Sequence, residues 1–163
     1  MVVGQRLKRM PQIINKLIRF DSMRLTQMED IGGCRTVLAG PDEVAAVGRR
    51  IEQKWSVRYR SDYRVEGKPK TGYRALHYVV IRRERMIEVQ LRTASQHQWA
   101  ELVERTASRL DYDLKDGQGP DDLIEYFRMA SEVIWLRETG ETVDVGLLEA
   151  FSELRDQVRG YFE

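Results

Sequence analysis

Two carboxylates of the chain stand among basic residues in a pattern that suits phosphate chemistry. Asp30 precedes a short apolar run, and Glu88, Gln90 and Arg92 alternate with apolar residues. Alternate residues of an extended strand share a face, so we expect these three side chains to form a polar floor. A polyphosphate substrate needs several Lys or Arg side chains and a divalent ion held by carboxylates. We therefore expect Asp30 and Glu88 to complete a two-carboxylate ion site if their strands are neighbours.

Further basic and aromatic residues form two clusters that could contact a nucleotide. One cluster lies near the N-terminus and the other in a loop rich in Gly and Lys: Arg6, Lys8 and Lys16, and Lys68, Lys70, Gly72, Tyr73, Arg74 and His77. Gly72 lets the backbone approach a ligand, and Tyr73 offers a ring for base stacking, worth about 1–3 kcal/mol. Each feature alone also has an ordinary explanation, namely a solvated helix face, a plain loop, or the exposed side of an edge hairpin in the case of Glu88.

The net charge of the 163-residue chain is +1, but its two parts have opposite charge. Residues 1–92 carry 20 Lys or Arg against 10 Asp or Glu, whereas residues 93–163 carry 7 against 16. This asymmetry indicates an anion-binding face and disfavours a uniformly basic DNA-coating protein, so we expect no DNA partner. The single cysteine excludes an internal disulfide, and the short apolar stretches predict no membrane span. With no leader pattern at the N-terminus, we expect a cytoplasmic protein.

Hydrophobic periodicity predicts an α+β fold with a mixed, largely antiparallel sheet of four to five strands packed with helices. The first predicted helix begins near Pro11, with Arg6 and Lys8 on the segment that enters it. Asp42 is predicted to cap the second helix, and Arg83-Glu84 to form a tight hairpin turn. The expected elements are helix 11–20, strand 34–38, helix 42–54, strands 56–65, 75–81 and 86–91, and helices 95–110, 121–137 and 145–162, with an irregularity near Ser61-Asp62.

Taken in order, these stretches resemble the synthetase domain of the RelA/SpoT homologue family, and the size is similar to that of the small alarmone synthetases. The family shows Arg-x-Lys before a helix, Asp-Ile-x-Gly-x-Arg, Gly-Tyr-Arg-Ser-Leu-His, Glu-Val-Gln-Ile-Arg-Thr and His-x-Trp-Ala-Glu. The corresponding segments here are Arg6–Lys8 with Lys16, Asp30–Arg35, Gly72–His77, Glu88–Thr93 and His97–Glu101. The resemblance covers about residues 5–110. We therefore expect a synthetase core over 1–115, followed by C-terminal helices over 116–163.

The resemblance implies a nucleotidyltransferase-like fold and a GTP/GDP diphosphokinase-type activity. In this reaction the β,γ-pyrophosphate of ATP passes to the 3′-hydroxyl of GDP or GTP, with Mg²⁺, and yields the alarmone (p)ppGpp. By the same resemblance Asp30 and Glu88 are the Mg²⁺ residues, and Glu88 is also the candidate base on the acceptor hydroxyl. One carboxylate does not easily bind a metal and act as a strong base, so we assign Asp30 mainly to the metal and leave the dual role of Glu88 open. The implied ATP-binding residues are Arg6, Lys8, Lys16 and Arg35. The implied acceptor-binding residues are Lys70, Tyr73, Arg74, His77, Gln90 and Arg92.

The chain departs from the family pattern on the acceptor side, and other functions therefore stay open. Val103 and Glu104 stand where the family has Glu-His, Gln12 replaces a serine, and the loop before Gly72 is spaced differently. One alternative is a toxin-type relative that pyrophosphorylates the 3′ end of tRNA and blocks translation. Its basic surface would be Arg49, Arg50, Lys54, Arg58, Arg60 and Arg64. The other is a catalytically impaired nucleotide-binding relative. The C-terminal helices could pack on the core, form a homo-oligomer or bind an antitoxin.

Overall fold

The structure, a computed structural model, describes residues 2–8 and 10–163. These residues form two compact units. The first contains the chain up to Asp62 together with Leu76–Arg92, and the second contains Tyr63–Ala75 together with Thr93–Glu163. The chain therefore enters the second unit, returns to the first and leaves it again. The predicted domain boundary near residue 115 stays a prediction.

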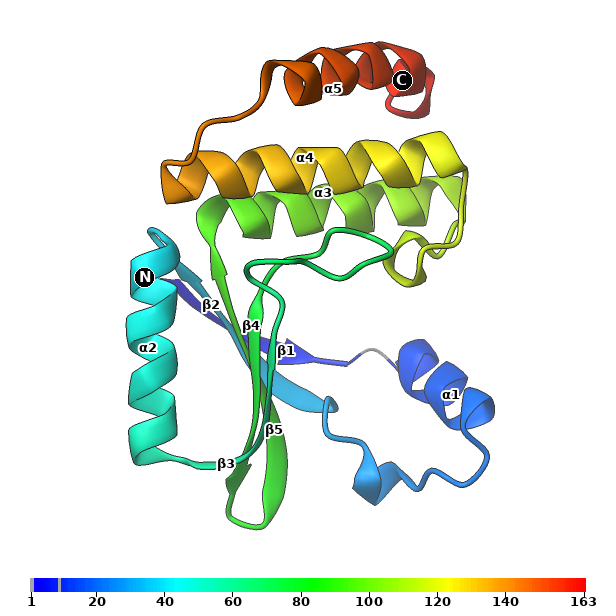
Figure 1. The fold of residues 1–163 in the computed structure, drawn as a ribbon. Helices are drawn as coiled ribbons and strands as arrows, with labels where there is room; N and C mark the ends of the chain where they lie inside the picture. Colours follow the sequence, from blue (N-terminus) through cyan, green and yellow to red (C-terminus); the bar gives the residue numbers. More distant parts are fainter. Residues whose placement is uncertain (1, 9) are drawn as a thin grey trace. The chain divides into compact units, whose positions relative to one another are not determined.

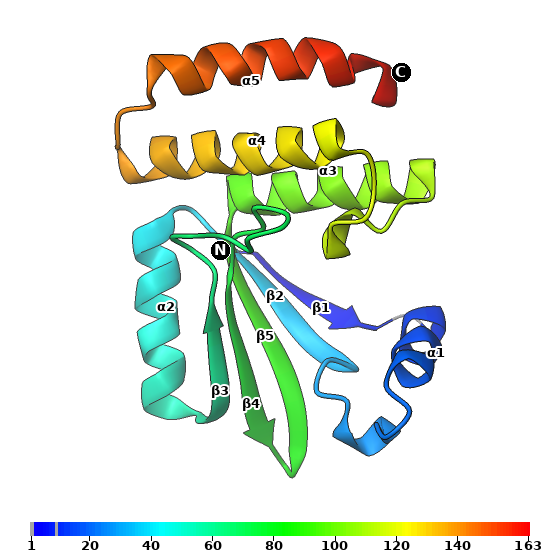
Figure 2. The same cartoon turned by 45° about the vertical axis from the view of Figure 1, so that its right-hand side comes forward.

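The first unit contains a five-stranded sheet and two helices (Figures 1 and 2). The strands lie in the order β1-β2-β5-β4-β3, and the β1–β2, β3–β4 and β4–β5 pairs are antiparallel. The predicted α+β class and the largely antiparallel sheet are thus confirmed. The elements of this unit are β1 (Val2–Leu7), α1 (Met10–Arg19), a 3-10 turn (Leu25–Gln27), β2 (Gly32–Leu38), α2 (Pro41–Lys54), β3 (Ser56–Asp62), β4 (Leu76–Arg82) and β5 (Arg85–Thr93).

Strand β1 is the element that the sequence pattern did not predict. Arg6 was expected on a segment entering the first helix, but it lies within β1, directly opposite Gly33 of β2. Five of the six β1 residues are exposed, so the strand has no buried face to produce an alternating pattern. The prediction of a helix near Pro11 is confirmed, because α1 begins one residue earlier.

Helix α2 packs on one face of the sheet and forms the core of this unit (Figure 1). Val44 and Ile51 of α2 contact apolar side chains of the strands, among them Leu38, Leu76, Tyr78, Val80, Val89 and Leu91. The prediction that Asp42 caps α2 is wrong. Gly40 occupies the capping position and Pro41 the first helical position, which suits a residue without an N–H.

The irregularity in β3 lies at its beginning, not near Ser61-Asp62 as predicted. Val57 is opposite Val80 and Tyr59 is opposite Val79, so Arg58 is an extra residue in the ladder. A bulge of this kind reverses the alternation of side chains beyond it. Val57 therefore packs with the core beneath α2, whereas Tyr59 shares the opposite face of the sheet with Val79.

The predicted hairpin between β4 and β5 is confirmed. Arg83 and Glu84 both have positive φ, 48° and 62°, as a two-residue hairpin turn requires. Strand β5 lies in the middle of the sheet, between β2 and β4. The alternative that Glu88 belongs to the exposed side of an edge hairpin is therefore wrong.

The second unit combines the loop Tyr63–Ala75 with three helices. The helices are α3 (Ala94–Leu110), α4 (Asp121–Thr139) and α5 (Val145–Gln157), with 3-10 turns at Leu114–Asp116 and Val158–Tyr161 (Figure 1). Thr93 and Gln96 begin α3 with reciprocal hydrogen bonds between side chain and backbone, a capping box. Trp99 lies in the apolar core and donates its indole N–H to the Phe127 carbonyl at 2.8 Å. None of the helices in the described part of the chain is long and apolar enough to span a bilayer.

Candidate functional site

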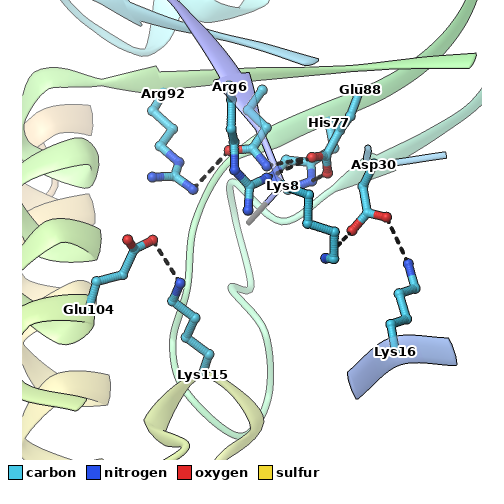
Figure 3. Close-up of polar contacts among 10 residues, drawn as sticks. Arg6, Lys8, Lys16, Asp30, His77, Glu88, Arg92, Glu104 and Lys115 are labelled. Atoms are coloured by element: carbon cyan, nitrogen blue, oxygen red, sulfur yellow. Dashed lines mark hydrogen bonds and ion pairs between the residues drawn. The ribbon is translucent and has the colours of Figure 1, made fainter. Parts of the chain in front are cut away.

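A row of side chains on the sheet face opposite α2 brings Arg6 to Glu88. Arg6 and Gly33 are directly opposite each other, and the backbone of Gly33 lies against that of Glu88 on the neighbouring strand. A Cβ atom on Gly33 would sit 2.5 Å from the Glu88 carbonyl oxygen. Because Gly33 has no side chain, Arg6 crosses β2 and its NH1 atom lies 2.8 Å from Glu88 Oε2 (Figure 3).

Glu88, Gln90 and Arg92 form the polar floor that the alternation in β5 predicts. Gln90 Nε2 donates to Glu88 Oε2 at 2.8 Å, and Arg92 NH2 donates to Gln90 Oε1 at 3.2 Å. Gln90 and Arg92 are only 4% and 3% exposed. His77 of β4, diagonally across the ladder, places Nδ1 3.3 Å from Glu88 Oε1. Glu88 is thus surrounded by donors from three strands.

Asp30 is held by two lysines at the start of β2. Lys8 Nζ lies 2.6 Å from Asp30 Oδ2, and Lys16 Nζ of α1 lies 3.0 Å from Oδ1 (Figure 3). The Lys8 backbone N–H also donates to the Ile31 carbonyl at 2.9 Å, which ties this end of β1 to the same turn. Each oxygen of the Asp30 carboxylate is therefore paired with an ammonium group, one from Lys8 just after β1 and one from Lys16 in α1.

Both carboxylates are ionised at neutral pH. Burial alone raises the pKa of Glu88, but the His77 hydrogen bond and the Arg6 charge outweigh it and hold the pKa below the ordinary value. Burial likewise raises the pKa of Asp30, and the hydrogen bonds and charges of Lys8 and Lys16 bring it below the ordinary value. Two ionised carboxylates are ligands that Mg²⁺ uses together with phosphate oxygens and water.

The ion site expected from the sequence needs Asp30 and Glu88 to be near one another. β2 and β5 are neighbours in the sheet, which is the condition set by the sequence analysis. The negative charges of both residues also act on the phenol of Tyr59 and raise its pKa, after the larger effects of burial and of Glu29. Among the described residues, no group of three or more His, Cys, Asp or Glu gathers. Carboxylate oxygens are ligands of the kind that Mg²⁺ takes, and the binding of a metal by Asp30 and Glu88 stays a prediction.

Arg35 is the remaining predicted site residue that lies in the first unit. It lies on β2 opposite Gly4 and two residues beyond Gly33, hence on the same face of the sheet. The first unit thus contains nine of the predicted site residues: Arg6, Lys8, Lys16, Asp30, Arg35, His77, Glu88, Gln90 and Arg92.

The predicted acceptor residues Lys70, Tyr73 and Arg74 lie in the loop of the second unit. The Tyr73 ring packs between Tyr63 and Trp99, with both ring centroids 6.3 Å away. The Lys68 ammonium lies 5.4 Å from the Tyr73 centroid, so a cation already occupies a face of this aromatic group. Lys70 is exposed.

Arg74 is a buried residue that holds its loop to α4. Its guanidinium donates to the carbonyls of Arg64 and Val65 and to Glu132, and it stacks on Trp135 at 5.3 Å. Only 3% of Arg74 is exposed. These contacts support a role in positioning the loop, and contact with an acceptor stays a prediction.

The structure also contains a contact that the sequence analysis did not find. Tyr59 of β3 donates its hydroxyl to Glu29, the residue before Asp30. The acidic pair Glu29-Asp30 was visible in the sequence. The bulge that turns Tyr59 toward it was not, because a bulge is defined by pairing with another strand.

Comparison with known proteins decides the family. Residues 5–115 match the family described as "Region found in RelA / SpoT proteins". The chain belongs to this family. The resemblance drawn from the motifs is thereby confirmed. No match was found among curated protein sequences.

Solved structures of small alarmone synthetases share the fold of this RelA/SpoT family member. The small alarmone synthetase 1 from Bacillus subtilis bound to its product pppGpp is 26% identical, with a TM-score of 0.70, over 98% of this chain and 80% of that chain. The small alarmone synthetase 2 from Bacillus subtilis, at 23% identity and a TM-score of 0.71, covers 86% of this chain and 77% of its own. The second likeness supports the fold alone.

Proposed function

We propose that this RelA/SpoT family member transfers the β,γ-pyrophosphate of ATP to the 3′-hydroxyl of GDP or GTP and so makes (p)ppGpp. The observation that carries the proposal is the paired site of the first unit, in which ionised Glu88 and Asp30 are each contacted by basic side chains. Family membership and the likeness to a synthetase bound to pppGpp support it. The expected biological role is in the stringent response.

On the donor side, the lysines and arginines of β1, of the residue that follows it, of α1 and of β2 bind ATP. Lys8 and Lys16 contact the phosphates by exchanging the Asp30 carboxylate for phosphate oxygens. Arg6 and Arg35 hold the adenine by stacking, which a planar guanidinium does well. Asp30 and Glu88 would hold Mg²⁺, which when bound neutralises charge on the phosphates and polarises the transferred group.

In the proposed reaction the acceptor 3′-oxygen attacks the β-phosphorus of ATP. A bond forms between these two atoms, the bond from the β-phosphorus to the α,β-bridging oxygen breaks, and AMP leaves. Glu88 accepts the hydroxyl proton, since a carboxylate must lie within hydrogen-bond reach of such a weak nucleophile. His77 and Gln90 hold the Glu88 carboxylate in place.

On the acceptor side, Tyr73 stacks on the guanine base and Lys70 contacts acceptor phosphates. Lys68 would have to leave the Tyr73 ring or lie beside the bound base. Arg92 extends the polar floor from Gln90 toward the start of α3. Arg74 positions the loop that carries Tyr73.

The test is a transfer assay with the full chain, Mg²⁺ and γ-labelled ATP, offering GDP, GTP or deacylated tRNA as acceptor. Label on the guanosine nucleotide supports the proposal. Label on tRNA alone would replace it with the toxin-type reaction, and no label on any acceptor would leave a nucleotide-binding relative. Within the first unit, Arg58 and Arg60 are engaged by acidic side chains, which reduces the basic surface that tRNA would need.

Glu88→Gln tests the proton-accepting role within the same assay. We expect transfer to fall by about 10²-fold or more while binding of ATP is largely kept. Glu52→Gln is the matched control, because Glu52 accepts a hydrogen bond from Tyr78 in the core beneath α2. Near-normal turnover of Glu88→Gln would show that another group accepts the proton.

A further inference from the structure

The segment that carries Asp30 is a turn, so contacts outside regular structure must fix this carboxylate. Residues Glu29 and Asp30 lie between a 3-10 turn and β2, and neither belongs to a helix or strand. Met28, just before them, is 4% exposed and anchors the backbone on that side. Lys8 and Lys16 contact the Asp30 carboxylate itself, and the turn that carries Asp30 has further contacts of its own.

Two consecutive residues of β3 hold Glu29. Tyr59 donates its hydroxyl to Glu29 Oε2, and Arg58 Nε lies 3.2 Å from Glu29 Oε1. The two oxygens of one carboxylate are therefore used by two different donors. A carboxylate held at both oxygens cannot rotate freely, and the next residue along the chain is Asp30.

The β-bulge is the reason that Tyr59 can take part. Without the extra residue, Val57 and Tyr59 would lie on the same face of the sheet, toward α2. With Arg58 inserted, Tyr59 turns to the other face and lies in one row with Val79 and Glu88. Tyr59 thus lies on the sheet face that also carries Glu88, and its hydroxyl contacts Glu29, the residue before Asp30.

We propose that Tyr59 and Arg58 are positioning residues that hold Asp30 in place for the metal through a clamp on Glu29. The role of Asp30 as a metal ligand rests on the proposed function, whereas the contacts of Tyr59 and Arg58 with Glu29 do not depend on it. Removal of a contact that orients a metal-binding group typically lowers metal affinity or activity by about 10–100-fold. The bulge in β3 is thus a part of the site, because it turns Tyr59 toward Glu29.

The same sheet provides a matched control on its other face. Tyr78 of β4 donates its hydroxyl to Glu52 of α2 at 2.8 Å, and Arg60 Nε lies 3.6 Å from the same carboxylate. Tyr78→Phe therefore removes a tyrosine–glutamate hydrogen bond of the same chemistry, within the core beneath α2. Tyr59→Phe removes only the bond to Glu29 and keeps the ring.

The first experiment measures amide hydrogen exchange of the full chain without ligands. We expect Tyr59→Phe to speed exchange of residues 28–31 by about fivefold, the effect of one lost hydrogen bond. Tyr78→Phe should leave that turn unchanged. Equal exchange of residues 28–31 in Tyr59→Phe and the unaltered chain would overturn the clamp, as would an equal change in both variants. This measurement needs no transfer activity, so its outcome is separate from that of the proposed function.

The second experiment measures metal dependence in the transfer assay. In Tyr59→Phe the Mg²⁺ concentration for half-maximal rate should rise by about tenfold while the rate at saturating Mg²⁺ changes little. Glu29→Gln keeps an acceptor for the Tyr59 hydroxyl but loses the charge that faces Arg58. Its Mg²⁺ concentration for half-maximal rate should therefore lie between that of the unaltered chain and that of Glu29→Ala. A lower saturating rate with unchanged Mg²⁺ dependence would contradict a positioning role toward the metal. If the unaltered chain transfers nothing, the proposed function fails and the exchange result alone decides the clamp.

Discussion

Gly33 is the position at which a single added carbon atom should disturb the site most directly. A Cβ atom there would lie 2.5 Å from the Glu88 carbonyl oxygen, 3.3 Å from its carbonyl carbon and 3.4 Å from its Cβ. The nearest atoms belong to the backbone of a paired strand, so no side-chain rotation can relieve the contact. Gly33→Ala must therefore push β2 away from β5, under the path that Arg6 takes to Glu88.

The expected cost follows from the size of this overlap. Overpacking a tightly packed region by one carbon costs about 1–3 kcal/mol. For a chain of this length each kcal/mol lowers the melting temperature by about 2–4 °C, so we expect a decrease of about 2–12 °C. The Arg6–Glu88 ion pair should lengthen at the same time, because the new methyl group lies between the strands that carry the two side chains.

Gly32→Ala is the control for Gly33→Ala. The two glycines are adjacent in β2, but a Cβ on Gly32 would meet no atom within 4 Å. We expect its stability to stay within about 0.5 kcal/mol of the unaltered chain, or to rise slightly because the unfolded chain loses freedom. Urea denaturation and thermal melts of both variants provide the measurement. Equal stability of Gly33→Ala and Gly32→Ala would refute the close approach of β2 and β5.

Three further predictions concern acid stability, the acceptor and the loop. The pKa of Asp30 and of Glu88 lies below the ordinary values of 3.8 and 4.5, so their stabilising effect is present above those values and is lost as pH falls through the lowered pKa. Urea titrations at pH values from 6 to 3 should thus show that the free energy of unfolding decreases more steeply in the unaltered chain than in the double variant Asp30→Asn with Glu88→Gln. Parallel plots of this free energy against pH would contradict the prediction. Tyr73→Ala should raise the KM for the guanosine acceptor more than the KM for ATP, and equal changes would remove the stacking role. Arg74→Ala should lower the free energy of unfolding by about 1–3 kcal/mol. Arg128→Ala, which breaks an exposed ion pair within α4, should lower it by less than about 1 kcal/mol, and similar losses would show that Arg74 is not structural.

The sequence predicted the parts of the site whose signal lies within one strand. Glu88, Gln90 and Arg92 alternate with apolar residues, and this alternation holds because β5 packs one face on a core. The motifs placed Asp30 next to a strand, and the structure makes that strand a neighbour of β5. The order of motifs also identified the family.

The features that the sequence did not predict depend on pairing between distant segments. β1 has no buried face, so Arg6 appeared to belong to the approach to a helix. The bulge at Arg58 exists only in relation to β4, and the reason for a glycine at position 33 exists only in relation to β5. The motif that contains Arg74 does not show that its side chain packs against α4, because this burial depends on a helix far along the chain.

The pairing of Asp30 with Lys8 and Lys16, and of Glu88 with Arg6, has a consequence for the dependence of binding on ionic strength. A basic group that is solvated before binding sheds a mobile counterion when it meets a phosphate, and such binding weakens steeply as salt is added. Here the basic groups already have fixed carboxylate partners and exchange one anion for another. Nucleotide affinity should therefore decrease less with added salt than the number of Lys and Arg side chains in the site would suggest. The carboxylates of Asp30 and Glu88 thus take the place of mobile counterions before a nucleotide binds.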